Sequence, residues 1–220
     1  MSSRAHLFHY QKDAVARIIF SQNTLLAHNV GCGKTYAMVA AGMKLKSMGL
    51  SARNLYVVPN SVTTQWRDVF SELYPEARVL CIEPNGFKPL VREQVLEELR
   101  DSEYDAAIIA YSCFGQIPLS NDYTRKNLES DELAIREEAA RDGAATSRLR
   151  KRYEKVCRTL STSASIECGI PRGVCFDDLG VTRLFVDEAH SFKNVPLFTK
   201  LQNVRGISVQ GSKRCQDMLD

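Results

Sequence analysis

A glycine-rich stretch carries the strongest chemical signal in this sequence. It reads Ala27-His28-Asn29-Val30-Gly31-Cys32-Gly33-Lys34-Thr35 and stands between an apolar run and a helical pattern. Glycines let backbone N–H groups turn inward around an anion, and the following helix adds positive potential at its N-terminus. Lys34 would then reach the β- and γ-phosphates of a nucleotide, and the Thr35 hydroxyl would bind Mg²⁺. The strict pattern has glycine where this chain has His28, so the match is to the looser Gly-x-Gly-Lys-Thr form.

A second signal is a pair of adjacent carboxylates far downstream. The apolar run Leu184-Phe185-Val186 ends in Asp187 and Glu188. Successive side chains at a strand end point in different directions, so Asp187 would hold Mg²⁺ while Glu188 faces the water that attacks the γ-phosphate. By itself, such a pair more often begins a helix. Because the glycine-rich loop is also present, we interpret the two segments as one site at the carboxyl ends of parallel strands.

Alternating strands and helices are predicted to position these residues. Short apolar runs predict strands at 24–27, 55–58, 105–110 and 182–186, with a fifth at 78–82. Helical patterns cover 35–48, 61–73 and 90–100; Gly49 would end the first helix and Ser61 would cap the second. This alternation predicts a three-layer α/β sandwich with a mainly parallel sheet.

Composition limits the classes of protein that remain. Hydrophobic residues at 44% and charged residues at 25% of 220 are typical of a globular chain, and a net charge of +3 does not by itself indicate a nucleic-acid partner. Seven cysteines without a Cys-x-x-Cys pair fit a reduced, intracellular protein. Neither a signal peptide nor an apolar run of membrane-spanning length is present in the sequence, so we expect a cytoplasmic protein without a membrane partner.

A charged segment at 121–163 interrupts the alternation. It is nearly free of β-branched residues and has an Asp142-Gly143 turn signal at its middle, which predicts a helical hairpin inserted between two strands. Its second arm, 148–158, holds six basic residues and one acidic residue. Two explanations stay open for this basic arm: a solvated helix face, or contact with a DNA backbone.

Four blocks in the same order resemble the first RecA-like lobe of superfamily 2 helicases and translocases. His9-Tyr10-Gln11 stands where that family has its Q motif, and 31–35 matches motif I. The stretch 57–66 resembles motif Ia, and Asp187-Glu188-Ala189-His190 is similar to motif II in its DEAH form. The resemblance spans nearly the whole chain and implies a RecA-like P-loop NTPase domain.

The resemblance implies a role for each matching residue. Gln11 would contact adenine, and the loop residues Gly31, Cys32, Gly33, Lys34 and Thr35 would bind ATP. Thr35 and Asp187 would hold Mg²⁺, and Lys34, Asp187 and Glu188 would serve hydrolysis. His190 would couple the nucleotide site to the rest of the motor. The nucleic-acid backbone would be touched by Ser61, Thr64 and Gln65, although helix capping by Ser61, Thr63, Thr64 and Gln65 explains these residue types equally well.

Further details resemble one branch of that superfamily. The box continues as Ser191-Phe192-Lys193-Asn194, which is similar to SWI/SNF-type translocases, and Trp66 in the Ia block points the same way. Ile108-Ile109-Ala110-Tyr111 resembles that branch's strand before the box, with Ala110 in place of its usual Thr. The insertion, 178–181 and 211–214 most resemble the helicase segment of large bacterial, phage and plasmid proteins that join a helicase to an adenine-specific DNA methyltransferase. The chain itself holds no methyltransferase motif.

These resemblances imply the ATP-binding lobe of a motor that moves on DNA, with duplex DNA as its partner. Residues 1–220 would form one RecA-like domain that is incomplete at its C-terminus, because motif III and a second lobe with its arginine finger would follow Asp220. An arginine finger is worth roughly 10³ to 10⁵ in rate in other P-loop enzymes. We therefore expect the isolated chain to bind ATP and Mg²⁺ and to hydrolyse ATP feebly.

Other functions fit parts of the same pattern. A nucleotide-dependent switch would need no DNA, but the sequence lacks the Asn/Thr-Lys-x-Asp motif that reads guanine. A scaffold without nucleotide would not need Lys34 with Asp187 and Glu188. A metal site of His6, His9, Cys168 and Cys175 matches no standard zinc spacing, and His28 is expected to pack or to hydrogen-bond rather than to contact nucleotide.

Overall fold

The computed structural model describes residues 6–21, 23–120 and 173–192, together with the helical positions Tyr123, Lys126, Glu129, Leu133, Glu154 and Arg158. The chain divides into two compact units: Met1–Ile117 with Asp178–Asp220, and Pro118–Asp177. The central sheet and the candidate site both belong to the first unit. The hairpin predicted at 121–163 and its basic arm lie outside the described residues, apart from those six helical positions.

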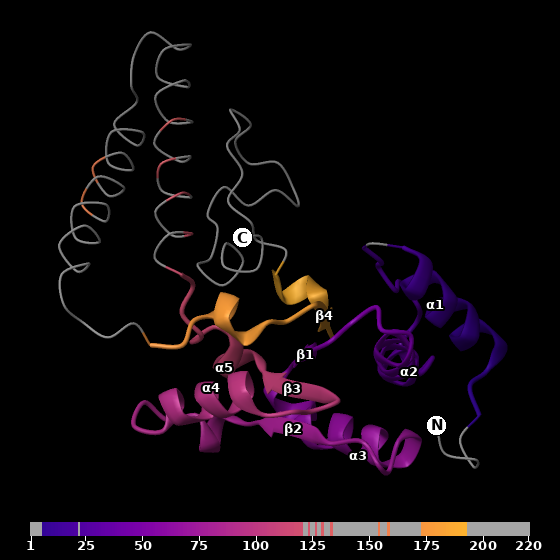
Figure 1. Cartoon of the computed structure of the whole chain (residues 1–220). Coiled ribbons are helices and arrows are strands. Elements are labelled where there is room, and N and C mark those ends of the chain that lie inside the picture. Colours follow the sequence, from indigo (N-terminus) through magenta and orange to yellow (C-terminus); the bar gives the residue numbers. More distant parts are fainter. Residues whose placement is uncertain are drawn as a thin grey trace, which may run out of the picture. The chain divides into compact units, whose positions relative to one another are not determined.

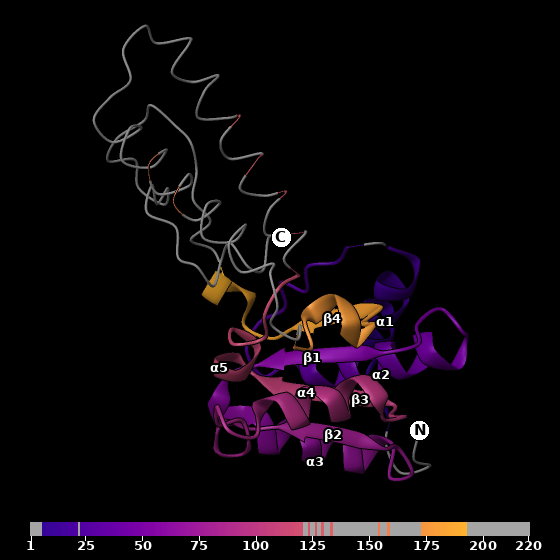
Figure 2. The same cartoon turned by 60° about the vertical axis from the view of Figure 1, so that its left-hand side comes forward.

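The described residues form a four-stranded, all-parallel sheet with the strand order β2-β3-β1-β4 (Figures 1 and 2). The strands are β1 (Asn54–Val58), β2 (Val79–Ile82), β3 (Ala106–Ala110) and β4 (Arg183–Val186). Each coincides to within one residue with a run that the sequence predicts to be a strand, so four of the five predicted strands are confirmed. All residues of the two central strands, β1 and β3, are buried, which explains why these runs are almost uniformly apolar.

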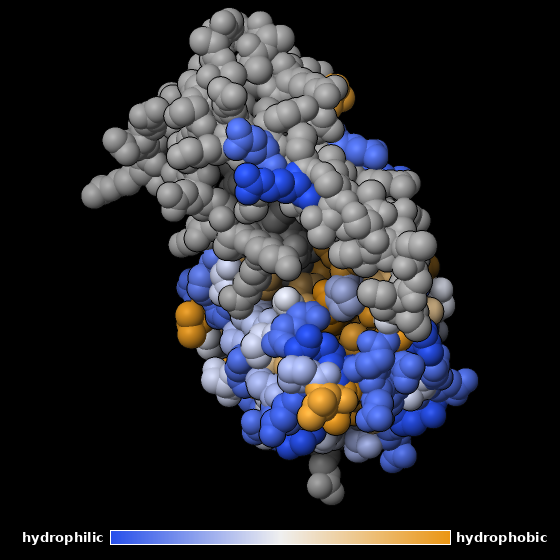
Figure 3. All heavy atoms as spheres, turned by 90° about the vertical axis from the view of Figure 1, so that its left-hand side faces the viewer, coloured by the Kyte–Doolittle hydropathy of each residue, from blue (hydrophilic) through white to orange (hydrophobic). Residues whose placement is uncertain are grey.

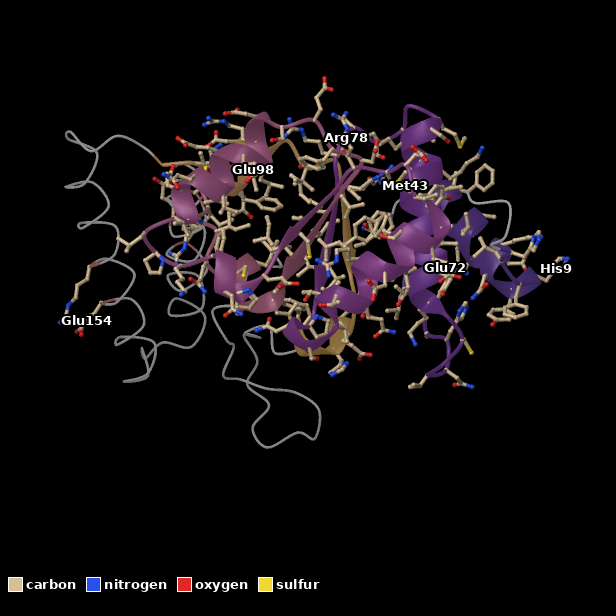
Figure 4. All side chains as sticks on the ribbon, turned by 90° about the horizontal axis from the view of Figure 1, so that it is seen from below. His9, Met43, Glu72, Arg78, Glu98 and Glu154 are labelled. Atoms are coloured by element: carbon tan, nitrogen blue, oxygen red, sulfur yellow. The ribbon has the colours of Figure 1, made fainter. Side chains whose placement is uncertain are left out.

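Helices cover both faces of this sheet. In the first unit, the described α-helices are α1 (His9–Phe20), α2 (Lys34–Ser47), α3 (Thr63–Leu73), α4 (Arg92–Asp101) and α5 (Tyr111–Phe114). Side chains of α2 and α3 form the main core cluster with Tyr56 of β1 and Phe185 of β4. On the opposite face, Arg53 donates to the Leu99 carbonyl of α4 at 2.9 Å. Figure 4 shows the strands between α4, marked by Glu98, and the helices α2 and α3, marked by Met43 and Glu72. The predicted three-layer α/β fold is confirmed.

The ends of α2 and α3 test the predicted caps. Gly49 follows α2 with φ 71°, and the N–H groups of Gly49 and Leu50 close the helix onto the carbonyls of Lys46 and Leu45 at 3.0 and 2.9 Å. The predicted cap at Ser61 is wrong. Helix α3 begins at Thr63, its N-cap residue is Val62, and no side chain caps it, because the exposed Ser61 lies one residue earlier in a short 3-10 turn.

The predicted strand at 24–27 is not formed. This segment keeps the alternating exposure of an extended chain, with Leu25 77% exposed, but it pairs with no strand among the described residues. A strand needs a neighbour for its N–H and C=O groups. Here the nearest sheet edge is β4, and a cavity lined by Thr24, Leu26, Leu184 and Phe185 lies between the two segments. The predicted strand at 24–27 is therefore wrong, because an apolar pattern does not report whether a partner strand lies alongside.

Large apolar side chains are exposed at several described positions, among them Phe20, Val30 and Leu90. On the face in Figure 3, the coloured atoms are mainly hydrophilic, with hydrophobic areas between them. Within the part of the chain that the structure describes, no helix combines the length and the apolar character needed to cross a membrane.

Candidate nucleotide-binding site

The glycine-rich loop has the backbone shape that an anion-binding loop requires. Gly31 and Gly33 adopt φ of 85° and 67°, in the left-handed region that favours glycine. Gly33 is also the N-cap residue of α2, and no side chain caps that helix. The first backbone N–H groups of α2 therefore stay available to an anion at its N-terminus, where the helix dipole adds positive potential.

Lys34 stands at the first position of α2 and bends back over its own loop. Its Nζ donates to the carbonyl oxygens of His28 at 3.0 Å and of Asn29 at 3.3 Å. His28 itself packs edge-on to Tyr10 with the ring centroids 6.2 Å apart. The ammonium group is thereby held beside the loop, on bonds to neutral carbonyls that a phosphate would replace with stronger, charge-assisted ones.

Gln11 of α1 supports the same loop through side-chain hydrogen bonds. This residue is buried, and its Oε1 accepts the Phe8 N–H at 2.9 Å. Its Nε2 donates to the carbonyls of Cys32 at 3.2 Å and Gly33 at 3.4 Å. A Cβ on Gly33 would lie 2.4 Å from Nε2, so the end of the Gln11 side chain would have to shift, and the φ of 67° itself favours glycine. Both amide hydrogens are committed to the loop, and only a lone pair of Oε1 remains for a ligand.

Asp187 and Glu188 follow β4 and are fixed by several neighbours. The Asp187 N–H continues the sheet ladder to the Val57 carbonyl at 3.0 Å. The Tyr111 hydroxyl donates to the carbonyls of Asp187 and Glu188, the second at 3.1 Å. Glu188 has φ 53°, a left-handed conformation that is uncommon outside glycine. Such local strain persists only where the surroundings impose it, and here Tyr111 supplies part of that constraint.

Both oxygens of the Asp187 carboxylate have a donor. Oδ1 accepts the Glu188 N–H at 3.0 Å, and Oδ2 accepts the indole N–H of Trp66 at 3.2 Å. Trp66 is the buried tryptophan of α3, a residue that the sequence marks only as part of the Ia block. Each carboxylate oxygen can accept more than one bond, so these two hydrogen bonds orient the carboxylate and leave it able to accept others.

His190 pairs with Glu188 rather than with the loop. Its Nδ1 lies 2.9 Å from Glu188 Oε2, with the two side chains 68% and 50% exposed. The residue belongs to a short 3-10 turn, Ala189–Phe192, that follows the two carboxylates. This contact gives the Glu188 side chain a preferred direction.

A cavity of about 540 Å³ joins the loop to these carboxylates. It is lined by residues of the loop, among them His28 and Lys34, and by Asp187, Glu188 and His190 from the end of β4. The volume falls within the 300 to 1,000 Å³ of small-ligand pockets. Of the other predicted nucleotide residues, none lines this cavity: Gln11, Gly31, Cys32, Gly33 and Thr35.

Of the two predicted Mg²⁺ ligands, Asp187 lines the cavity and Thr35 does not. Mg²⁺ uses one or two carboxylates together with waters and substrate phosphates, and the Asp187 carboxylate is a donor of that kind. No group of three His, Cys, Asp or Glu residues that would hold a metal occurs in the part of the chain that is described. The alternative set of His6, His9 and Cys175 is therefore not assembled there, while Cys168 lies outside the described residues.

The predicted nucleic-acid residues gather at the start of α3. Thr64 and Gln65 occupy its first turn and, like Ser61 before it, are exposed. Beside them, Asn60 and Ser112 exchange hydrogen bonds of 2.9 and 3.1 Å and line a second, open pocket with Tyr111. The sequence did not mark Asn60, Ser112 or the hydroxyl of Tyr111 as site groups. Neither residue type nor spacing indicates that the segments after β1 and β3 come into contact there.

The described residues thus form a three-layer α/β domain in which a glycine-rich loop faces a pair of carboxylates. Residues 18–220 match the family model described as a probable helicase domain. Because this match covers most of the chain, the chain belongs to that family of helicase domains, and a helicase-type function follows. In a search of curated proteins, no significant match was found.

Proposed function

We propose that this chain is the ATP-binding lobe of a DNA-dependent ATPase that couples ATP hydrolysis to movement on DNA. The observation that carries the proposal is the cavity that brings Lys34 opposite Asp187 and Glu188. Loop, lysine and two carboxylates are the groups that phosphoryl transfer from a Mg²⁺-bound nucleotide uses. Membership of the helicase-domain family supports dependence on a nucleic acid, and DNA as that nucleic acid is part of the proposal.

The chain's own residues supply binding and orientation. The N–H groups of α2 and the Lys34 ammonium would hold the phosphates, and Lys34 would leave the carbonyls of His28 and Asn29 to do so. Thr35 and Asp187 would hold Mg²⁺, which when bound neutralises charge on the phosphates. Glu188, directed by His190, would orient the attacking water.

Gln11 has two possible roles in this scheme. Its hydrogen bonds to Cys32 and Gly33 support a role as a brace of the loop. Contact with adenine would use the remaining lone pair of Oε1 or would require Gln11 to leave the loop. The proposal includes the contact with adenine.

The proposal extends to partners. Duplex DNA would run across Ser61, Thr64 and Gln65, which are exposed and do not cap α3. The basic residues of 148–158 would add contacts to the DNA backbone, a suggestion that rests on sequence alone. A second RecA-like lobe would supply the arginine finger. The DEAH-box, SWI/SNF-like branch and an association with a DNA methyltransferase are part of this proposal.

Calorimetric titration of ATP and Mg²⁺ tests the nucleotide site. We expect the wild type to bind and Lys34→Ala to bind at least about 30-fold more weakly, because a charge-assisted contact worth about 2 kcal/mol is removed. Lys44→Ala is the matched control, since it removes the same charge from an exposed position near the other end of α2. Equal affinities in all three proteins would refute the proposed site.

Titration with duplex DNA tests the second part of the proposal. DNA should bind weakly, with an affinity that falls as salt rises, and should strengthen ATP binding. Replacing the six basic residues of 148–158 should lower the salt dependence. Nucleotide binding without any DNA binding would instead indicate a nucleotide-dependent switch.

Hydrolysis by the isolated chain should be feeble, because the arginine finger is proposed to come from another lobe. Phosphate release measured with and without DNA checks this expectation. Robust DNA-stimulated turnover by these 220 residues alone would contradict the need for a second lobe.

A further inference from the structure

Trp66 is the buried residue that makes a direct side-chain contact with the candidate Mg²⁺ carboxylate. Its side chain is 1% exposed, and its Nε1 donates to Asp187 Oδ2 at 3.2 Å. The two residues are 121 positions apart in the sequence and come from α3 and from the end of β4. The contact therefore joins a helix that begins with the candidate DNA-facing residues to the candidate nucleotide site.

We propose that Trp66 is a positioning residue that aims the Asp187 carboxylate at Mg²⁺. The inference rests on the proposed function, because it assumes that Asp187 holds the metal of a bound nucleotide. In metal sites, partners that hydrogen-bond to a ligand fix its orientation, and their loss commonly lowers metal affinity 10- to 100-fold.

The surroundings of Trp66 leave its indole little freedom. The ring lies against Tyr56, with centroids 5.5 Å apart, and Tyr56 in turn stacks on Phe185 of β4 at 4.6 Å. Tyr56 also meets Phe70, one turn further along α3, edge-on at 5.1 Å. This aromatic cluster fixes the plane of the indole and hence the direction of its N–H.

The carboxylate is held from two sides. The Glu188 N–H binds Oδ1 from the backbone, and the indole binds Oδ2 from the core. A buried indole N–H needs an acceptor, and a carboxylate is the strongest that a side chain offers. If the carboxylate turned toward another direction, this N–H would lose its bond in an apolar environment.

Packing alone does not require this arrangement. A phenylalanine at this position would fill most of the same core, whereas the N–H is needed only if the carboxylate must be aimed. The substitution Trp66→Phe therefore separates the positioning role from the packing role.

Trp66 is the only tryptophan of the chain, so its indole N–H gives a single signal in a nitrogen-15 spectrum. We expect Asp187→Asn to shift this signal in the protein without ligands, because the charged acceptor is lost. The substitution Asp105→Asn removes a carboxylate that bonds Lys46 elsewhere, and should leave the signal in place. An unmoved signal in Asp187→Asn would overturn the inference whatever the protein binds.

Metal affinity supplies the second readout. With ADP bound, Mn²⁺ titration followed by electron paramagnetic resonance should show about tenfold weaker metal binding in Trp66→Phe, while ADP binding in EDTA is unchanged. Phe70→Leu is the control, because it disturbs the same aromatic cluster without touching Asp187. It should lower the melting temperature and keep metal affinity.

The outcomes separate this inference from the proposed function. Failure of the wild type to bind any nucleotide would refute the proposed function. Intact nucleotide binding with wild-type metal affinity in Trp66→Phe would overturn the positioning role alone. Equal loss of metal affinity in Trp66→Phe and Phe70→Leu would also overturn it, since packing would then explain the effect.

Discussion

The two sides of the candidate site are held in different ways. On the loop side, 24–27 pairs with no strand among the described residues, and Lys34 bonds to carbonyls of its own loop. On the carboxylate side, Asp187 continues the sheet and is bonded by Trp66, Tyr111 and the Glu188 N–H. The carboxylates are thus oriented without a ligand, whereas under the proposed function the loop would exchange its internal bonds for bonds to the phosphates.

This comparison predicts that the loop depends on few residues. Gly33→Ala should produce the largest effect, because it combines an unfavourable φ of 67° with a Cβ only 2.4 Å from Gln11 Nε2. We expect ATP affinity to fall at least about 100-fold, equivalent to about 2.7 kcal/mol. Gly49→Ala is the matched control: its φ of 71° is similar, and nothing lies within 4 Å of its added Cβ. It should lower the free energy of unfolding by about 1 kcal/mol and leave ATP binding intact.

If both alanine variants bind ATP as the wild type does, the loop is not the binding element. Calorimetry for ATP and thermal unfolding for stability distinguish the two effects in the same samples.

On the carboxylate side, loss of one hydrogen bond should have a smaller effect on function, because several neighbours hold Asp187 and Glu188 in place. Tyr111→Phe removes the hydroxyl that bonds the carbonyls of Asp187 and Glu188. We expect ATP-dependent phosphate release to fall about tenfold and the free energy of unfolding to fall by about 1 kcal/mol. Tyr36→Phe is the control, because it removes a hydroxyl that bonds the exposed Glu72 carboxylate. It should change neither phosphate release nor the free energy of unfolding. Equal behaviour of the two variants would contradict the special constraint on the carboxylates.

Gln11→Ala sharpens the comparison on the loop side. If Gln11 mainly braces Cys32 and Gly33, ATP and GTP should lose affinity to a similar extent, about five- to tenfold, as expected for about 1 kcal/mol. If Gln11 reads adenine, only ATP should weaken and the preference over GTP should vanish. Competition titrations with both nucleotides decide between these two roles.

The smallest effect concerns a contact that belongs to neither side. Lys46 bonds Asp105 at 3.0 Å. Burial raises the pKa of Asp105, but bonds from the Arg78 N–H and from Lys46 outweigh it, so the net pKa lies below the ordinary value. A carboxyl group whose pKa is lower in the folded than in the unfolded state stabilises the fold at pH values above its unfolded pKa of about 3.9. This stabilisation is lost as the pH falls through the folded-state pKa.

We therefore expect Asp105→Asn to reduce the free energy of unfolding by about 1 kcal/mol at neutral pH, with the difference from wild type shrinking below about pH 4. Denaturant unfolding at several pH values measures this. Nucleotide affinity should be unchanged. A change in nucleotide affinity would show that the candidate site depends on the contact between Lys46 and Asp105, which the structure does not indicate.

The sequence predicted the strands, the helices and the local backbone of the glycine-rich loop because residue type and local backbone needs are short-range properties. Glycines at 31 and 33, Lys34 and the pair after β4 were all legible, as were four strands and the helices between them. Apolar runs become buried strands, and Gly49 ends a helix, for reasons contained within a few residues.

The rest depended on which segments meet in space. Only the tertiary structure showed that 24–27 has no strand partner within the described part of the chain, that α3 begins beyond Ser61, and that Gln11 contacts the loop. It alone placed the indole of Trp66 on Asp187, 121 residues away. Spacing along the chain determines which groups are available, but the direction of a side chain and the partner of a buried N–H are decided by packing between distant segments.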